Sequence, residues 1–276
     1  MEFRISAART EQLEEERRAQ SAWVLRRPEF APVIEGFLRR EFLEPQAADD
    51  LEALELQRII GFAKAEVPWY RDSEVWSALR PGPVDRETLA AMPVVTKLQL
   101  LENFDALKAL RLPAGERVVH EARTTGTTGR PARVAFCRQA HMSFGLLAQR
   151  PHRWFRFDPH LKQAVIRQAR VLPRQSDGSQ LKDGQVQRLD LWMHTGAFFH
   201  TGNHVAITRG NPLEFQLEWL RQERPGYLIG SPGGVESLVY AAQGKPVDSL
   251  QGLRTVAATL TEAVRRQIES ATGLPI

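Results

Sequence analysis

The chain has 276 residues, of which 42% are hydrophobic and 25% are charged, and it carries a single cysteine, Cys137. This length can bury a sizeable core in one large domain, alone or with a small appendage. A single cysteine excludes an intramolecular disulfide and a cysteine-rich zinc site, and its place in the apolar run RVAFCR favours a buried, inert thiol.

The charge pattern narrows the classes of partner. The net charge of +4 comes from arginines interleaved with acidic residues, which is typical of solvated helix faces and not of a nucleic-acid-binding surface. No run of about eighteen apolar residues is present, and the first residues, MEFRISAARTEQ, are charged where a signal peptide is apolar. We therefore expect a cytoplasmic protein that acts on a small molecule and binds neither nucleic acid nor a membrane.

Residues 1 to about 110 are predicted to be mostly helical. Two helices should meet at the prolines of RRPEFAP, and a longer helix should follow in DDLEALELQRIIGFAKAEV with Asp49 and Asp50 as caps. Shorter helices are predicted in DRETLAAM and in TKLQLLENFDALKAL, the latter capped by Thr96. We assign residues 1–50 to a helical N-terminal arm, whose exposure is compatible with a homodimer.

The second half of the chain alternates short apolar runs with helical segments. Strands are predicted in RVVHEA, RVAFC, QAVIRQ, VQRLDLW, HVAITR, GYLIGS and RTVAAT. Two helices lie between the later strands, one with Asn211 as its N-cap and one running from Thr261 to Gly273. This order predicts an α/β fold for residues 51–276, a mostly parallel sheet with flanking helices that follows the helical arm. Residues 173–185 are predicted to form a mobile excursion.

The string TTGTTGRP forms a loop rich in glycine and threonine between two predicted strands. Its backbone amides and hydroxyl groups could converge on one phosphate, with an arginine adding a permanent charge. From the residues alone, a phosphate cradle and an ordinary hairpin turn both remain open, and the glycine spacing matches neither a P-loop nor a dinucleotide-binding motif. The residues concerned are Thr124, Thr125, Gly126, Thr127, Thr128, Gly129 and Arg130.

The loop resembles the phosphate loop of the adenylate-forming superfamily, a Ser/Thr-rich string that ends in T-G-[KR]-P. Its flanks are similar to the phenylacetate-CoA ligase and coenzyme F390 synthetase branch, as seen in VPWYRD followed by LAAMPVVTKLQLLENF, and in RPGYLIGSPGGVESLV. The segment LRTVAATLTEAVRRQIESATG resembles the family's strand, polar turn and helix. These similarities follow the family's order from about residue 51 to the end of the chain.

The resemblance implies an AMP-forming acid–thiol ligase. Such an enzyme joins a carboxylate to the α-phosphate of Mg-ATP, and coenzyme A then displaces AMP, so that ATP, Mg²⁺ and coenzyme A are the implied cofactors and substrates. The loop residues 124–130 would bind the β- and γ-phosphates, with Arg130 where the family usually has lysine. The acyl group would lie near WMHTGAFFHTG and LIGSPGG. The substrate-binding residues so predicted are His194, Gly196, Gly230, Ser231 and Pro232.

Two departures from the family pattern concern the nucleotide and the end of the chain. Where the family has a Gly-Glu or Gly-Ala-Glu turn at the adenine, this chain has Ala257, Ala258 and Thr259. The metal-binding glutamate, the ribose-binding aspartate and the catalytic lysine of the family have no counterpart before Ile276, so no catalytic residue is assigned. We therefore expect the front portion of a longer ligase that is incomplete and inactive alone, or else a naturally shortened relative.

Other readings of the sequence are less well supported. His194, His200 and His204 are close together, but their spacing fits no common metal-ligand pattern, so no metal site is predicted there. A hydrolase is disfavoured because GSPGG lacks the G-x-S-x-G arrangement of a nucleophilic serine. The alternative function is a non-catalytic nucleotide-binding or interaction module derived from the same fold.

Overall fold

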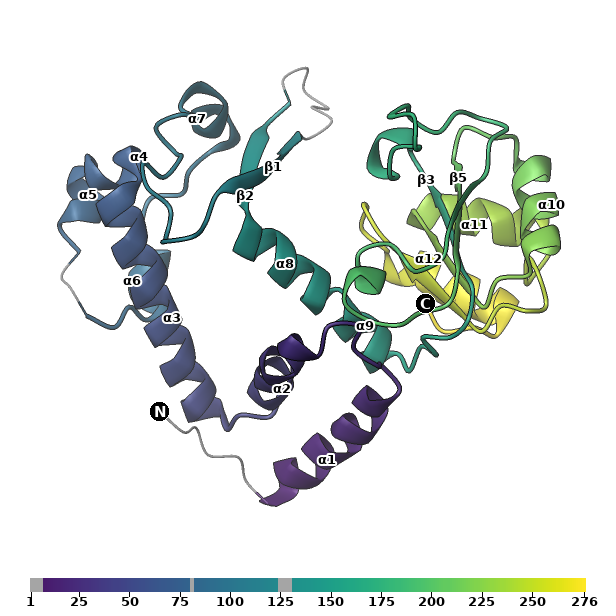
Figure 1. The fold of residues 1–276 in the computed structure, drawn as a ribbon, viewed down its shortest axis with the longest axis horizontal. Coiled ribbons are helices and arrows are strands. Elements are labelled where there is room, and N and C mark those ends of the chain that lie inside the picture. The colour runs from purple at the N-terminus through teal and green to yellow at the C-terminus, as the bar shows by residue number, and fades with distance from the viewer. Residues whose placement is uncertain (1–6, 80–81, 124–130) are drawn as a thin grey trace. The chain divides into compact units, whose positions relative to one another are not determined.

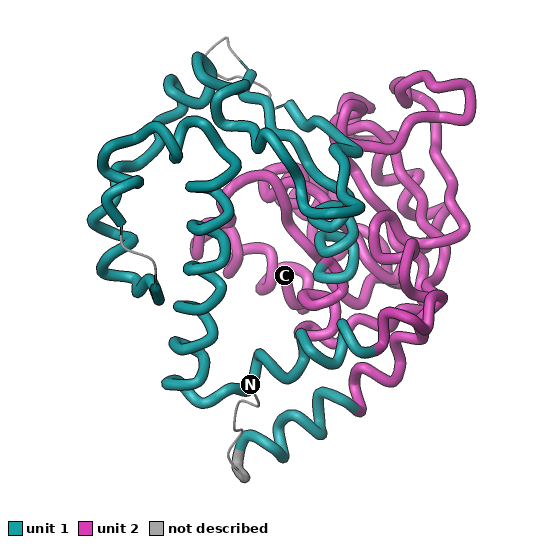
Figure 2. The backbone as a smooth tube through the Cα atoms, turned by 60° about the vertical axis from the view of Figure 1, so that its left-hand side comes forward, with its two compact units in different colours: residues 1–17, 32–147 teal, residues 18–31, 148–276 magenta. Residues whose placement is uncertain are grey.

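A computed structural model describes residues 7–79, 82–123 and 131–276. The chain forms two compact units, each assembled from two segments (Figure 2). Unit 1 consists of residues 1–17 and 32–147, and unit 2 of residues 18–31 and 148–276. The predicted boundary at residue 50 stays a prediction, and helix α3 (Pro45–Glu66) runs through that position. In the described parts of the chain, no helix is both long and apolar enough to cross a membrane.

Unit 1 combines helices with one β-hairpin (Figure 1). The hairpin strands are antiparallel. The elements are α1 (Ala7–Ser21), which continues into unit 2, α2 (Ala31–Arg40), α3 (Pro45–Glu66), α4 (Pro68–Arg71), α5 (Glu74–Ser77), α6 (Arg86–Ala90), α7 (Lys97–Glu102), β1 (Val118–Arg123), β2 (Arg133–Cys137) and α8 (Arg138–Leu147).

Local sequence signals account for the helix starts of unit 1. Thr96 caps α7 as predicted: its hydroxyl accepts a hydrogen bond from the Gln99 amide, and the Gln99 side chain accepts one from the Thr96 amide. Helix α3 begins earlier than predicted, with Pro45 in its first turn, so Asp49 lies inside the helix and is not its cap. Proline is favoured there because its fixed φ suits a helix start and its missing N–H is not needed.

Unit 2 is an α/β unit around a five-stranded sheet with the order β4-β5-β3-β6-β7. Strands β5, β3, β6 and β7 are parallel, and β4 is antiparallel to β5 at one edge. The predicted fold class is therefore confirmed. The elements are η1 (Pro28–Phe30), α9 (Gln149–Trp154), β3 (Gln163–Arg167), η2 (Ala169–Val171), β4 (Gln187–Leu189), η3 (Thr195–Ala197), β5 (His204–Thr208), α10 (Leu213–Glu223), β6 (Tyr227–Gly230), α11 (Pro232–Ala241), β7 (Gly252–Thr255) and α12 (Glu262–Thr272).

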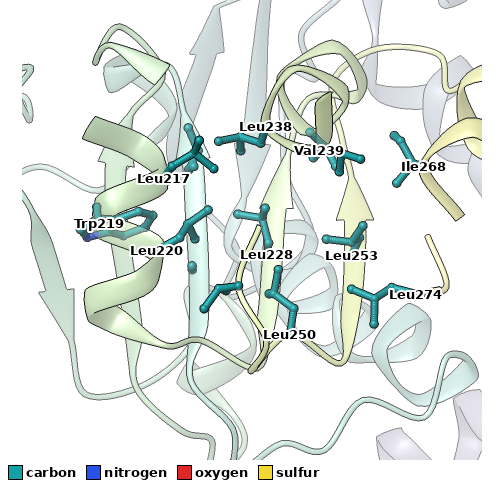
Figure 3. Packing of buried hydrophobic residues seen from close by; sticks show 14 of the residues in the cluster. Leu217, Trp219, Leu220, Leu228, Leu238, Val239, Leu250, Leu253, Ile268 and Leu274 are labelled. Atoms are coloured by element: carbon teal, nitrogen blue, oxygen red, sulfur yellow. The ribbon is translucent and has the colours of Figure 1, made fainter. Parts of the chain in front are cut away.

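The core of unit 2 lies between one face of the sheet and helices α10, α11 and α12 (Figure 3). Leu228 and Leu253 from the sheet pack with Leu220, Leu238 and Ile268 from the three helices, and all five side chains are buried. At about 25 cal/mol per Å² of apolar surface removed from water, this layer is the main source of stability for the unit. It holds the strand ends in fixed positions relative to the helix starts.

The other face of the sheet carries a smaller apolar cluster and a group of aromatic side chains. Val165 and Ile229 belong to the cluster. Beside it, the Trp192 ring meets the rings of Trp23 and Tyr227 edge to face, with centroids 5.7 and 5.8 Å apart. Trp23 comes from the short segment 18–31, so contacts between aromatic rings attach this segment to unit 2.

Three local predictions for unit 2 can be compared with the structure. Helix α12 has Thr261 as its N-cap and Gly273, in the left-handed conformation, as its C-cap, as predicted. The N-cap of α10 is Pro212 and not the predicted Asn211. The buried Asn211 amide group instead donates to the Thr208 carbonyl, 2.8 Å away, while its side-chain oxygen accepts from the Gly184 amide. Because these bonds occupy the Asn211 side chain, that side chain does not cap the helix.

The stretch 173–185 was predicted to be mobile, but it is attached to the sheet at its second half. Leu181 is buried in the cluster on the second face, and the Thr208 hydroxyl donates to the Asp183 carboxylate. Gly210 allows this contact, because a Cβ atom there would lie 2.6 Å from the Asp183 carboxylate oxygens. The connection is therefore a packed part of unit 2.

Candidate functional site

The carboxyl ends of the parallel strands in unit 2 form the candidate site. Strand β3 ends at Arg167, β5 at Thr208, β6 at Gly230 and β7 at Thr255. Because these strands are parallel, their carboxyl ends lie side by side along one end of the sheet, which we call the carboxyl edge. The α/β proteins bind their ligands at this end. Of the predicted substrate residues, Gly230, Ser231 and Pro232 lie at this edge, between β6 and α11.

The turn from β6 into α11 is shaped by its small residues. The Ser231 hydroxyl caps the helix by accepting from the Gly234 amide, 3.3 Å away, and Pro232 occupies the first turn. Gly230 is buried, and a Cβ atom there would lie 3.1 Å from Val235 Cγ2. A cavity of about 400 Å³ opens beside this turn, and Gly230, Ser231 and Arg209 are among its lining residues.

Two arginines stand at the ends of neighbouring strands. Arg167 is the last residue of β3 and pairs with Thr208, whereas Arg209 follows β5, so the two side chains start on opposite faces of the sheet. The backbone amide of Arg209 donates to the Arg167 carbonyl, 2.8 Å away. Within the described ranges, neither guanidinium has an acidic partner. Burial lowers the pKa of Arg167, which is partly enclosed at the strand end. Arg209 lines the cavity beside Gly230, so its charge favours an anionic ligand there, whereas Arg167 does not line that cavity.

The turn after β7 keeps an unusual backbone conformation. Ala257 has a φ of +73°, in the left-handed region that favours glycine. The Val256 amide next to it donates to the Gly230 carbonyl, 2.9 Å away, which connects this turn to the start of α11. The backbone shape that a glycine would readily adopt is therefore present at Ala257, although the residue is alanine.

The remaining predicted substrate residues lie at the opposite edge of the sheet. Because β4 is antiparallel to β5, with Leu189 opposite His204, the chain leaves β4 at the amino ends of the parallel strands. His194 is exposed there with a φ of +65°. Gly196 is buried, its carbonyl accepts from Arg26 Nη1 at 2.7 Å, and a Cβ atom would lie 2.5 Å from Leu191 Cβ. The structure therefore does not bring these residues together with Gly230, and their substrate role stays a prediction.

Two buried histidines of unit 2 are held neutral. Burial lowers the pKa of His204 to about 4, with a further contribution from the charge of His194. Its Nδ1 lies 3.3 Å from the Gln163 side-chain oxygen. Burial also lowers the pKa of His152 to about 3, helped by the Arg254 guanidinium, whose Nη1 lies 2.7 Å from His152 Nε2. Because His152 is neutral, Nε2 can accept this hydrogen bond.

The residues predicted to bind phosphate lie outside the described residues. Strand β1 ends at Arg123 before them and β2 begins at Arg133 after them, so a hairpin carries the loop as the sequence predicted. Their phosphate contacts stay a prediction. They are Thr124, Thr125, Gly126, Thr127, Thr128, Gly129 and Arg130.

The implied Mg²⁺ needs oxygen donors from the chain or from the nucleotide. Among the residues that the structure describes, no group of three histidine, cysteine, aspartate or glutamate side chains could hold a metal ion. Mg²⁺ that accompanies a nucleotide is usually held by one or two carboxylates together with the phosphates, so this finding excludes only a cage of protein ligands in the described residues.

Sequence reasoning missed the arginines of unit 2 that have no acidic partner. Arg167 and Arg209 each follow a buried apolar strand, which is the position where side chains reach a strand edge. This signal was available, because both strands were predicted. Arg254 could not have been found in this way, since its partner His152 is about a hundred positions away in the chain.

Comparisons with known proteins found likenesses in structure only. No protein-family model matches the chain, and no curated protein sequence matches it. An open conformation of 2-hydroxyisobutyryl-CoA ligase, in complex with 2-HIB-AMP and CoA, matches with a TM-score of 0.61 and 19% identity over 86% of this chain and 54% of that chain. The same ligase in the postadenylation state with R3-HIB-AMP matches with a TM-score of 0.61 and 19% identity, over 86% of this chain and 49% of that one.

A third structure of that ligase, in complex with 2-HIB-AMP and CoA in the thioesterification state, has a TM-score of 0.58 and 20% identity. The chain thus spans about half the length of the ligases that it matches. At this level of identity the likeness shows the fold and leaves the chemistry open. Over 86% of its length, the chain has the fold found in 2-hydroxyisobutyryl-CoA ligase, in agreement with the adenylate-forming fold implied by its sequence motifs.

Proposed function

We propose that this chain belongs to an AMP-forming ligase of the phenylacetate-CoA ligase-like branch, which activates a carboxylic acid with ATP and transfers the acyl group to coenzyme A. The observation that carries the proposal is the fold match over 86% of the chain to a ligase solved with an acyl-adenylate and CoA. The loop TTGTTGRP and its flanking motifs, in the family order, support the same function from the sequence.

The geometry of the carboxyl edge supports this function in two ways. Arg209, which lines the cavity beside Gly230, supplies positive charge for a carboxylate or a phosphate, and among the described residues no acidic partner competes for it. The turn after β7 has Ala257 in the left-handed conformation, at the place where the sequence resemblance expects the turn that touches adenine. A backbone of that shape presents N–H and C=O groups in fixed directions, which can bind an adenine ring without a specific side chain.

One observation favours the alternative, a nucleotide-binding module without catalysis. At the turn that the resemblance places beside adenine, this chain has Ala257, Ala258 and Thr259 and no glutamate. Such a chain could bind the nucleotide through its phosphate loop and backbone and still lack the groups that stabilise the transition state.

Two measurements on the 276-residue chain separate these functions. Isothermal titration with ATP and with AMP measures binding, and acid-dependent exchange of labelled pyrophosphate into ATP measures adenylate formation. Both should be repeated with Gly126→Val, which adds a bulky side chain to the predicted phosphate loop. Binding and exchange that are both lost in the variant support the ligase. Binding without exchange supports a nucleotide site at the loop and fits both the module and a ligase portion that is inactive alone. Absence of ATP and AMP binding in the unaltered chain would refute both.

A further inference from the structure

A second cavity lies within unit 1, and none of the residues of the candidate site in unit 2 lines it. Its volume is about 360 Å³. One wall is a face of the β-hairpin, where Arg133, Ala135 and Cys137 alternate along β2 and therefore point to the same side. The other wall is formed by α7 and the turn after it, including Leu100 and Phe104.

The lining of this cavity is mostly apolar and is reached by solvent. Leu100, Phe104 and Leu107 are only partly buried, and Val118 and Val134 are 46% and 43% exposed. Exposed apolar side chains around one cavity are a feature of binding sites, because the ligand removes their surface from water. The apolar part of the ligand is therefore expected to lie between the hairpin and α7.

The charged residues of the lining are both cations. The Arg133 guanidinium carbon lies 4.2 Å from the centre of the Phe104 ring, and Lys108 Nζ lies 5.3 Å from the same ring. Their acidic partners, Glu121 at 2.8 Å from Arg133 and Asp105 at 4.0 Å from Lys108, do not line the cavity. Arg133 is thus ion-paired with Glu121, and Lys108, with a longer contact of 4.0 Å to an exposed aspartate, supplies the less compensated positive charge of the mostly apolar lining.

Arg133 also has an unused hydrogen-bond donor. Its Nε is buried and has no hydrogen-bond partner in the described part of the chain, although Nη2 donates to Glu121. A buried N–H group without a partner is costly, by about 1–3 kcal/mol in ordinary proteins. Because Nε is enclosed and Glu121 already pairs with the guanidinium, a ligand oxygen reaches this donor only when the Arg133 side chain moves.

We propose that this cavity binds a small amphiphilic carboxylate, with its hydrocarbon chain against Phe104, Leu107 and the hairpin face and its carboxylate at Arg133 and Lys108. The site goes beyond the proposed ligase function, because it lies wholly within unit 1 and uses none of the residues at the carboxyl edge of the sheet in unit 2.

The lone cysteine of the chain provides a reporter for this test. Cys137 lines the cavity and is partly exposed, so a bound ligand should slow its reaction with the neutral reagent N-ethylmaleimide. The probes are octanoate, its uncharged counterpart octanamide, and inorganic phosphate as a head group without a chain. Each variant is compared with its own rate in the absence of ligand, so that changes in intrinsic thiol reactivity do not count.

Octanoate is expected to slow the reaction at least fivefold at saturation, and octanamide to need about a tenfold higher concentration for the same effect. Lys108→Gln and Arg133→Gln should each weaken protection by octanoate about three- to tenfold and leave protection by octanamide unchanged. Ala135→Leu, which fills the cavity from the hairpin face, should remove protection by both. Arg58→Gln is the matched control, because Arg58 is exposed on α3 away from the cavity.

Three results would overturn the proposal. The first is no protection by octanoate. The second is equal protection by octanoate and octanamide, or an octanoate effect that both charge variants leave unchanged. The third is protection by inorganic phosphate at the same concentrations as octanoate, which would show a simple anion site with no use for the apolar lining. Lys108→Gln keeps the test decisive if Arg133→Gln fails to fold, because Lys108 lies outside the strands.

Discussion

Gly202 is a position where one methyl group is expected to destabilise unit 2 strongly. A Cβ atom at this residue would lie 2.4 Å from the carbonyl oxygens of both His160 and Leu161. Ordinary contacts between non-bonded heavy atoms are about 3.5–4.0 Å, so both carbonyls would have to move by roughly 1 Å. They have little freedom, because the Gly202 amide donates to the Pro159 carbonyl and the Leu161 carbonyl accepts from Trp192 Nε1 at 2.9 Å.

The expected size of the effect follows from these contacts. Overpacking costs about 1–3 kcal/mol, and weakening the Trp192 hydrogen bond adds about 0.5–1.5 kcal/mol. We therefore expect Gly202→Ala to lower the free energy of unfolding of unit 2 by about 2–4 kcal/mol. For a domain of about 150 residues, this corresponds to a fall in Tm of roughly 4–16 °C.

Differential scanning calorimetry of the whole chain is the suitable assay, since the two units can unfold in separate transitions. Gly233→Ala is the matched control, because a Cβ atom there meets nothing within 4 Å and alanine is the better helix former. That variant should raise the free energy of unfolding by up to about 1 kcal/mol. A Gly202→Ala protein that melts within 2 °C of the unaltered protein, roughly the precision of such a comparison, would refute the reasoning.

The other predictions concern buried histidines, the core and the turn after β7. Because burial lowers the pKa of His204 from 6.5 to about 4 and that of His152 to about 3, the unfolded state binds protons first as the pH falls. The free energy of unfolding should therefore be highest above pH 6.5 and should fall towards pH 4, by about 3 kcal/mol for His204 alone. Denaturant titrations of a His204→Asn variant should show a smaller fall over the same pH range. Ile268→Ala, at a fully buried position, should lower the free energy of unfolding by about 2–5 kcal/mol in the same titrations. Ile59→Ala, at a position that is 58% exposed, should lower it by less than about 0.5 kcal/mol. Similar losses at both positions would contradict the assignment of the core. Ala257→Gly should raise the free energy of unfolding by about 1 kcal/mol by relieving the left-handed backbone, and a loss of stability would show that the turn has a different conformation.

The sequence predicted those features that depend on neighbouring residues. The caps at Thr96, Thr261 and Gly273 and six of the seven strands were found because their signals lie within a few residues of the element. The seventh strand was predicted in RTVAAT, but β7 ends at Thr255 and the residues from Val256 onward form a turn. Asn211 was misassigned because its side chain has two uses, and the partner that decides between them, Gly184, is distant in the sequence. A local pattern contains no information on that competition.

The composition of the two units was beyond the reach of local patterns. The segment 18–31 joins unit 2 because Trp23 packs against Trp192 and stacks on His152, contacts that span well over a hundred residues. Burial of aromatic rings is non-directional, and helix periodicity alone does not say which core a tryptophan joins. The arm at residues 1–50 stays a prediction, and composition changes along the chain do not show which segments pack together.

The direction of one short strand decides which predicted site residues can act together. Sequence reasoning placed His194 beside Gly230 because both follow apolar runs, but β4 is antiparallel to β5, so His194 lies at the amino edge and Gly230 at the carboxyl edge. If the carboxyl edge binds the substrates, His194→Gly should leave the acid concentration for half-maximal pyrophosphate exchange unchanged, because glycine keeps the left-handed backbone while the imidazole is lost. Arg209→Gln, at the carboxyl edge, should raise that concentration about three- to tenfold. The reverse pattern would show that the amino edge binds the acid, and that the charge at the ends of β3 and β5 serves another purpose.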